Sequence, residues 1–230
     1  MPRRTLHRRA KGSVPDARTA AKYLITLPGK QLHEDPDGVP RITSPCLFGN
    51  DRPLELEIGC GSGEYLCSLA RQCPGTNFVG VEVRNKSLLE AIATAAWDAL
   101  DNIVFLRTDV RLLYPRFVPD SLRAVYLHYP DPVTRPKFAK RRIFTQGFLD
   151  QMHAALTCNG RLSVITDLEP YFLEMLELAE RDDRWQKTHD SRYLIGFEPA
   201  AKSRFQRLWE GHGLPTLRFE LVKHGRHRGS

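Results

Sequence analysis

Three glycines in one short stretch of the chain follow a glutamate, whose carboxylate could bind a positively charged ligand. Residues 57–63 are Glu-Ile-Gly-Cys-Gly-Ser-Gly, with Gly59, Gly61 and Gly63 at alternate positions. Glycine has no Cβ, so such a run lets the backbone turn sharply and lets a ligand lie against the main chain. A bare G-x-G-x-G pattern is a weak signal, and its meaning depends on the residues around it.

Three carboxylates accompany this glycine run, namely Glu57, Glu82 and Asp109. Glu82 ends the next predicted strand, where an acid can accept hydrogen bonds from both ribose hydroxyls, and Asp109 could accept one from an adenine amino group. The third glycine comes one residue too early for G-x-G-x-x-G, which makes a pyrophosphate a poor match. Glu57 suits an ammonium or sulfonium charge, so the set predicts S-adenosylmethionine. The alternative for Glu82 and Asp109 is a solvated carboxylate or a helix cap.

A second group of residues combines a carboxylate with positive charge. Residues 128–133 are His-Tyr-Pro-Asp-Pro-Val, so Asp131 lies between two prolines in what we expect to be a stiff loop at the carboxyl end of a sheet, where open α/β folds bind ligands. Basic residues that could contact nucleic-acid phosphates follow it. They are Arg135, Lys137, Lys140, Arg141 and Arg142. Taken alone, this run would equally suit a solvated loop and helix start.

The elements that must position these side chains alternate along the chain. Apolar periodicity predicts strands over residues 54–58, 78–83, 103–106, 122–127, 162–165 and 217–222, and helices from the glycine run to about 71 and over residues 86–100, 143–156 and 171–180. Such alternation predicts right-handed crossovers and a parallel sheet with helices on both faces. The last strand is expected to be an antiparallel edge.

Length and composition favour one folded domain between two basic ends. The chain has 230 residues, 41% of them hydrophobic, and no apolar run approaches the roughly 18 residues of a membrane span. We expect a basic, partly flexible arm over residues 1–52, the main domain over residues 53–223 and a basic tail over residues 224–230. The formal net charge of +7 favours a polyanionic partner such as a nucleic acid.

The cysteines argue against a metal site and against a disulfide framework. Their number is odd, and no two are spaced as C-x-x-C; they are Cys46, Cys60, Cys67, Cys73 and Cys158. We therefore expect reduced thiols, no bound metal and a cytoplasmic location. The N-terminus has no apolar segment of a secretory signal, although its arginines leave an organellar transit peptide possible.

In these motifs the chain resembles the bacterial tRNA (guanine-N7-)-methyltransferases of the TrmB type. The resemblance runs from about Leu54 to Val222. The first motif, Leu-Glu-Ile-Gly-Cys-Gly-Ser-Gly, is shared by many methyltransferases. More specific are Tyr-Pro-Asp-Pro at residues 129–132 with Lys-Arg-Arg at residues 140–142, and Thr-Asp-Leu-Glu-Pro-Tyr at residues 166–171.

The resemblance implies a Rossmann-like class I S-adenosylmethionine-dependent methyltransferase, an α/β fold with a mostly parallel seven-stranded sheet. It implies methyl transfer to N7 of a guanosine in the variable loop of tRNA. We expect a monomer or a homodimer. It places Glu57, Glu82, Asp109 and Asp131 against the cofactor, together with the three glycines. Asp131 is the residue usually called catalytic, and Asp167 contacts the target nucleotide.

The chain departs from the family pattern at three places, one of them at residues 137–138, where Lys-Phe stands in place of the family's Arg-His pair. Val133 stands where the family usually has Trp, although Arg135 keeps a positive charge nearby, and Ile195 stands where the family has Thr. Glu198 remains a candidate for binding the guanine, and the Lys-Arg-Arg run for binding the RNA. Two alternatives stay open: a methyltransferase of the same fold acting on another RNA, a small molecule or a protein, and a catalytically idle RNA-binding homologue.

Overall fold

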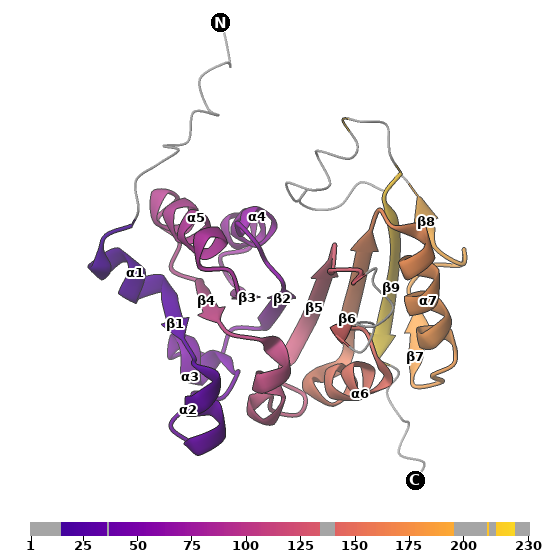
Figure 1. Cartoon of the computed structure of the whole chain (residues 1–230), viewed down its shortest axis with the longest axis horizontal. Helices are drawn as coiled ribbons and strands as arrows, with labels where there is room; N and C mark the ends of the chain where they lie inside the picture. Colours follow the sequence, from indigo (N-terminus) through magenta and orange to yellow (C-terminus); the bar gives the residue numbers. More distant parts are fainter. Residues whose placement is uncertain (1–14, 36, 134–140, 196–210, 212–214, 224–230) are drawn as a thin grey trace, which may run out of the picture.

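A computed structural model describes residues 15–35, 37–133, 141–195, 211 and 215–223 (Figure 1). The arginines that precede Pro15 and the basic tail from residue 224 lie outside the described residues.

The described residues form one mostly parallel sheet of nine strands. The strands are β1 (Leu24–Thr26), β2 (Leu54–Ile58), β3 (Asn77–Glu82), β4 (Ile103–Arg107), β5 (Leu122–His128), β6 (Leu156–Thr166), β7 (Trp185–Lys187), β8 (Leu194–Ile195) and β9 (Leu217–Lys223). Their order is β1-β4-β3-β2-β5-β6-β9-β7, and β8 also pairs with β9. Strands β1 to β6 are parallel to one another, and β9 runs antiparallel to β6. The expected parallel α/β fold is confirmed, with β1 and the short β7 and β8 raising the strand count above the expected seven.

Helices cover both faces of this sheet (Figure 1). They are α1 (Ala17–Tyr23), α2 (Gly29–Glu34), α3 (Ser44–Phe48), α4 (Glu64–Gln72), α5 (Asn85–Trp97), the 3-10 helix η1 (Val110–Arg116), α6 (Gln146–Ala155) and α7 (Glu169–Glu180). Neighbouring side chains of β3 point to opposite faces, because Phe78 joins the core under α1, α4 and α5, whereas Val79 joins the core under α6 and α7. Two apolar cores thus hold the sheet from both sides.

The structure corrects the expected N-terminal arm in its second part. From Asp16 onward the chain folds onto the sheet: the Asp16 carboxylate caps α1 by accepting from the N–H of Thr19 at 2.7 Å. Strand β1 then pairs in parallel with β4 and covers what would otherwise be an exposed edge. The hydroxyl of Tyr23 donates to the carbonyl of Leu100 at 2.8 Å. This segment is therefore part of the folded body.

Two other expectations from the sequence differ from the structure. Strand β9 is antiparallel as expected, but it is not an edge, because β7 and β8 pair with it on the side away from β6. The helix expected over residues 143–156 begins later, since the side chain of Thr145 accepts a hydrogen bond from the N–H of Phe148 and caps α6 there.

Candidate functional site

The glycine run forms a tight turn between β2 and α4. The N–H groups of Gly59 and Cys60 both donate to the carbonyl oxygen of Val81, at 2.8 and 3.1 Å, which ties the turn to β3. All three glycines have left-handed φ values, of 73° at Gly59, 53° at Gly61 and 66° at Gly63. Other residue types adopt this conformation only with strain.

The three glycines differ in what surrounds them. A Cβ built on Gly59 or Gly61 would meet nothing within 4 Å among the described residues, so the main chain there is open to a ligand. A Cβ on Gly63 would lie 2.8 Å from the Cβ of Ala91. Gly63 thus lets α4 begin close to α5, and its predicted cofactor contact stays a prediction.

Glu57 is a buried carboxyl at the carboxyl end of β2, with only 4% of its surface exposed. Its Oε2 atom has no hydrogen-bond partner among the described residues. Burial, and secondly the negative charge of Glu82, raise the pKa of Glu57 to about 8. A buried carboxyl oxygen without a partner is unfavourable, and a cationic ligand would relieve that cost. The residue therefore fits the ammonium and sulfonium charges of S-adenosylmethionine.

Glu82, at the end of β3, holds the glycine turn and its own connection to α5. Its Oε2 accepts from the N–H of Gly61 at 3.1 Å, and its Oε1 accepts from the N–H groups of Val83 and Arg84, both at 2.8 Å. A carboxylate has about four acceptor positions, so these bonds leave about one for a ribose hydroxyl. The carboxylate therefore has fewer free acceptor positions for the two ribose hydroxyls than the sequence suggested.

Asp109 follows β4 and caps the 3-10 helix η1. Its Oδ1 accepts from the N–H of Arg111 at 3.0 Å, and its carboxylate forms an ion pair with the Arg111 guanidinium. The hydrogen bonds from the Arg111 side chain hold the pKa of Asp109 below its ordinary value, and the residue is ionised at neutral pH. The structure thus shows the helix cap that the sequence left as an alternative, and the adenine contact stays a prediction.

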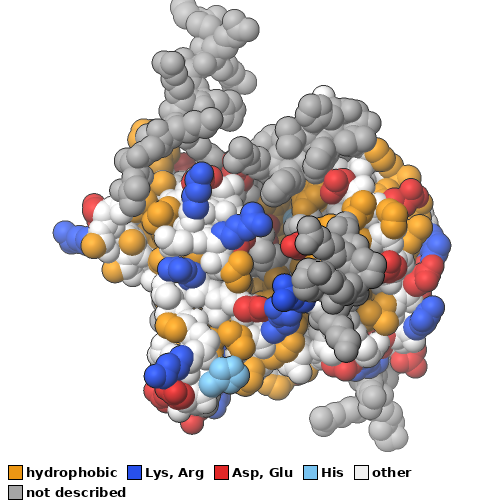
Figure 2. All heavy atoms as spheres, viewed as in Figure 1, with side chains coloured by type: hydrophobic (Ala, Val, Ile, Leu, Met, Phe, Trp, Pro, Cys, Tyr) orange, Lys and Arg blue, Asp and Glu red, His pale blue; other side chains and the backbone are white. Residues whose placement is uncertain are grey.

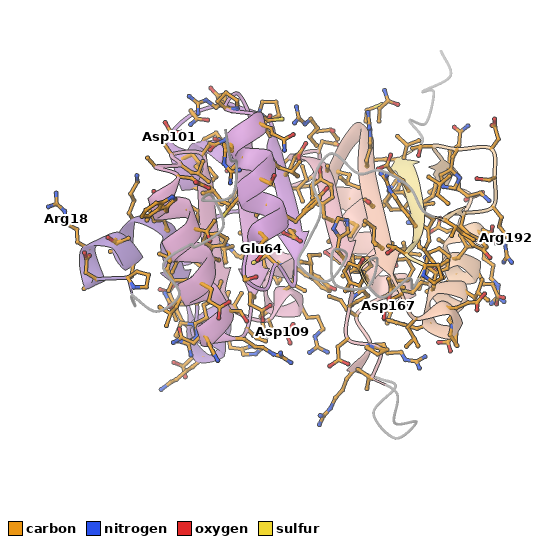
Figure 3. The ribbon with its side chains drawn as sticks, turned by 90° about the horizontal axis from the view of Figure 1, so that it is seen from above. Arg18, Glu64, Asp101, Asp109, Asp167 and Arg192 are labelled. Atoms are coloured by element: carbon orange, nitrogen blue, oxygen red, sulfur yellow. The ribbon has the colours of Figure 1, made fainter. Side chains whose placement is uncertain are left out.

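Asp131 and Asp167 come from the ends of neighbouring strands. β5 and β6 pair in parallel up to His128 and Ile165, and the N–H of Tyr129 donates to the carbonyl of Ile165 at 2.7 Å. Asp131 is exposed, and its Oδ1 accepts from the N–H of Val133 at 3.0 Å. In the view of Figure 3, Asp109 lies near the centre and Asp167 to its right. Parallel strands thus bring these carboxylates to one end of the sheet, the end at which the parallel strands have their carboxyl ends.

The predicted RNA-binding residues are only partly described. Arg135, Lys140 and Glu198 lie outside the described residues. Arg141 is exposed, whereas Arg142 is half-buried and donates from Nε to the carbonyl of Pro132 at 2.9 Å. Ile195, at the end of β8, is 60% exposed, although it is a large apolar side chain.

An aromatic cluster beside Glu57 was not expected from the sequence. Tyr126 is the register partner of Glu57 between β2 and β5, and its ring lies 5.1 Å from that of Tyr65 in an edge-on arrangement. The ring of His128 lies 4.6 Å from that of Tyr65. Burial lowers the pKa of His128 to about 3, so this imidazole stays neutral. Tyr126 and His128 are two residues apart on one strand, so their side chains point to the same face. That spacing was the signal in the sequence that could have predicted the aromatic cluster.

A second carboxylate of β2, that of Glu55, forms a hydrogen bond with this aromatic cluster. It accepts from the hydroxyl of Tyr126 and from Nε of Arg123, both at 2.8 Å. Arg123 also donates to the hydroxyl of Thr76 at 2.9 Å. The two glutamates of β2 therefore differ: Glu55 is fully engaged by protein groups, whereas Glu57 has an oxygen left for a ligand.

The rest of the described surface offers other features away from these carboxylates. Figure 2 shows Lys and Arg side chains in several separate places on one face, with Asp and Glu among them. A pocket lined by Arg41 and residues 115–119 lies before β5, at the opposite edge of the sheet. Among the described residues, no three His, Cys, Asp or Glu side chains are grouped to hold a metal ion. No helix in the described ranges is both long and apolar enough to span a membrane.

Comparison with known proteins gives a family for this arrangement. A family model described as "Putative methyltransferase" matches residues 51–212. The tRNA (guanine-N(7)-)-methyltransferase of Rubrobacter xylanophilus is 51% identical over 223 residues, which cover 97% of this chain and 100% of that protein. The enzyme of the same name from Chloroherpeton thalassium is 40% identical and covers 94% of this chain and 95% of its own length.

Solved structures agree with the fold. The 16S rRNA methyltransferase KamB has a TM-score of 0.56 at 19% identity and covers 77% of this chain and 91% of its own. TrmN from Thermus thermophilus has a TM-score of 0.52 at 24% identity and covers 75% of this chain and 45% of its own. These likenesses confirm the class I methyltransferase fold. With relatives that match over nearly the whole chain, the protein belongs to the tRNA (guanine-N(7)-)-methyltransferase family.

Proposed function

We propose that this chain transfers a methyl group from S-adenosylmethionine to N7 of a guanosine in tRNA. One observation carries the proposal: the carboxyl of Glu57 is buried and lacks a partner on Oε2, beside an open turn at Gly59 and Gly61. Such a site favours a cationic ligand that lies against main chain. The tRNA substrate is supported by the names of relatives that match nearly the whole length of this chain.

We assign the cofactor to the carboxyl edge of the sheet. When bound, S-adenosylmethionine supplies a methyl group on a positively charged sulfur. Glu57 meets the positive charge, the main chain at Gly59 and Gly61 makes room for the ligand, and Glu82 accepts from the ribose. Gly63 is assigned to the same cofactor-binding turn. Asp109 and Asp131 complete the set that we assign to cofactor binding.

The residues of this chain position the base and do not need to remove a proton from it. Guanine N7 carries a lone pair and no proton, so it is a nucleophile as it stands. As N7 gains a methyl group, the base gains positive charge, which a nearby carboxylate stabilises. We assign this role to Asp131, and we assign hydrogen bonds from the donor edge of guanine to Asp167 and Glu198. Orientation of the base by these groups supplies the catalysis.

RNA binding is assigned to the basic residues near Asp131 and to the chain ends. Arg135, Lys140 and Arg141 follow Asp131 in the sequence and suit phosphates of a bound RNA. The variable loop as target, a monomer or homodimer, the absence of a resident metal and a cytoplasmic location are part of the same proposal. That none of the five cysteines forms a disulfide supports a reducing compartment.

A transfer assay tests the proposal against its rivals. The purified chain is incubated with methyl-labelled S-adenosylmethionine and separately with bulk tRNA, small RNA or a protein pool. We expect label only with tRNA, and expect digestion to release 7-methylguanosine. A tRNA transcript with adenosine in place of the variable-loop guanosine should stay unlabelled. Label in small RNA or in protein would favour a methyltransferase of the same fold with another substrate, for which the exposed Ile195 provides a reason. No label at all would favour an idle homologue.

A further inference from the structure

The loop that carries Asp131 is held in an unfavourable backbone conformation at both ends. Tyr129 has a φ of 52° and Val133 a φ of 43°, both in the left-handed region that non-glycine residues avoid. For the β-branched Val133 this is a marked departure from usual geometry. Such conformations cost free energy and persist only where surrounding contacts impose them. The contacts that hold this loop therefore determine where the carboxylate of Asp131 lies.

The beginning of the loop is tied to the sheet, and its interior to its own side chain. The N–H of Tyr129 donates to the carbonyl of Ile165, which extends the pairing of β5 with β6. The Oδ1 atom of Asp131 accepts from the N–H of Val133 at 3.0 Å, so the carboxylate and the end of the loop move as one unit. This unit still needs a partner outside the loop.

Arg142 is that partner. Its Nε donates to the carbonyl oxygen of Pro132 at 2.9 Å, at the residue between Asp131 and Val133. Its Nη1 forms an ion pair with the carboxylate of Glu174. Its guanidinium lies over the ring of the buried Tyr171, 5.0 Å from the ring centre. Both of these last residues belong to α7, so Arg142 connects the loop to a helix that is packed on β6 and β9.

These contacts use the guanidinium in a way that differs from a phosphate contact. One face of the group is stacked, one Nη is paired with a carboxylate, and Nε is directed at a carbonyl of the same chain. A planar fork with several donors suits such a connection, and a lysine could not reproduce it. The negative charge of Glu174 beside it also disfavours an incoming phosphate.

We propose that Arg142 is a positioning residue: with Glu174 and Tyr171 it holds the Pro132 carbonyl, and through it fixes the carboxylate of Asp131 against the guanine. This replaces the phosphate contact that the sequence suggested for Arg142. The inference rests on the proposed function, because it takes Asp131 as the group that orients the base.

Two variants separate positioning from phosphate binding. Arg142→Lys keeps the positive charge but loses the fork, and Glu174→Gln removes an acid that no phosphate would contact. Glu177→Gln is the matched control, because Glu177 lies on the same helix in an exposed pair with Arg181. For each variant we would measure single-turnover methylation of tRNA, the dissociation constants of tRNA and S-adenosylmethionine, the salt dependence of tRNA binding, and the melting temperature.

We expect turnover to fall by about tenfold to 100-fold in Arg142→Lys and Glu174→Gln, because small misplacements of a reacting group cost that much. Cofactor affinity, melting temperature and the salt slope of tRNA binding should stay as in Glu177→Gln. Provided that the wild-type chain methylates tRNA, two results would overturn the inference. One is normal turnover in Glu174→Gln, and the other is a weaker tRNA affinity with normal turnover in Arg142→Lys. A wild-type chain that methylates no tRNA would instead refute the proposed function, and this inference with it.

Discussion

The carboxylate of Glu82 accepts a hydrogen bond from the backbone N–H of Gly61 at 3.1 Å, so the end of β3 fixes the turn that follows β2. The other oxygen of the same carboxylate accepts from two further N–H groups, at Val83 and Arg84. One side chain therefore shapes both main-chain segments that border the proposed cofactor site. A substitution at Glu82 should act through the shape of the turn as well as through any ribose contact.

Replacing this carboxylate by an amide should weaken cofactor binding. Glu82→Gln keeps the size of the side chain but offers a single acceptor oxygen, so it cannot accept from Gly61 on one side and from Val83 on the other. Hydrogen bonds to a charged acceptor contribute about 1.5 to 3 kcal/mol, which corresponds to an increase of roughly tenfold or more in the dissociation constant of S-adenosylmethionine. Isothermal titration calorimetry measures this dissociation constant. Glu90→Gln, at an exposed position on α5, is the control and should bind as wild type.

A methyl group added at Gly80 of β3 should also disturb the glycine turn that follows β2. A Cβ built on Gly80 lies 2.7 Å from the Sγ of Cys60 and 2.8 Å from the ring of Phe105. Overpacking of this kind costs about 1 to 3 kcal/mol, and Gly80→Ala should lower the melting temperature and the cofactor affinity together. Gly75→Ala is the control, because a Cβ there meets nothing within 4 Å among the described residues. Equal melting curves for the two variants would contradict the prediction.

The carboxyl of Glu57 should make the stability of the ligand-free chain depend on pH. Burial, then the charge of Glu82, raise the pKa of Glu57 from 4.5 to about 8. The folded chain therefore holds this proton more tightly than the unfolded chain. The stability linked to that proton is complete below pH 4.5 and is lost as the pH rises through about 8. Melting temperatures should fall more steeply with pH in wild type than in Glu57→Gln.

Differential scanning calorimetry between pH 5 and pH 8 measures this difference. The slope reaches about 1.4 kcal/mol per pH unit where the proton is bound only in the folded chain. Glu90→Gln should follow wild type throughout, since that carboxyl is exposed. If the wild-type and Glu57→Gln curves ran parallel, Glu57 would have to be ionised or paired in the ligand-free chain.

Much of this arrangement was predictable because it is local in the sequence. Alternating apolar residues fixed the strands, and a glycine run after a strand fixed the turn, so that Glu57 and Glu82 could be placed at one edge of the sheet. Strand β1 was missed, since its three residues gain their strand conformation only by pairing with β4, about 80 residues later in the chain. Its signal is long-range, and no periodicity in three residues can carry it.

The roles of charged side chains were harder to predict than their positions. Arg142 was expected at phosphates because of its neighbours in the sequence, but its partners Tyr171 and Glu174 come from a helix about 30 residues away. Asp109 was given two roles, and only the backbone of η1 shows that it caps a helix. A carboxylate or guanidinium has several uses, and packing decides among them.

Removal of one charge at Asp131 should lower turnover more than cofactor affinity. In Asp131→Asn the amide oxygen can still accept from the N–H of Val133, so the loop keeps its hydrogen bond while the negative charge is lost. A charge that stabilises the methylated guanine acts mainly in the transition state, and we expect a loss of about 100-fold in single-turnover rate. Cofactor binding, measured by calorimetry, should change by about threefold or less. Unchanged turnover would remove Asp131 from its proposed role.

The net positive charge of the chain equals the charge of its two ends. Residues 1–14 contain five Lys and Arg, residues 224–230 contain two, and neither segment contains an acid, so these seven account for the net charge of +7. Residues 15–223 therefore carry no net formal charge, and Figure 2 shows Lys and Arg mixed with Asp and Glu on one face of that part. Attraction to the phosphates of an RNA should depend strongly on the ends.

Deleting residues 1–14 should weaken tRNA binding and flatten its dependence on salt, while turnover at saturating tRNA barely changes. Each phosphate contact that is lost removes roughly 0.7 to 0.9 from the slope of log affinity against log salt concentration. Turnover should persist because these residues add affinity without orienting the guanine, which is assigned to Asp131. A full-length variant with Gln at the five basic positions controls for length and should match the truncation in a filter-binding titration. If both variants kept the wild-type slope, residues 1–14 would not contact the RNA, and a targeting segment or a passive tail would be the better explanation of their arginines.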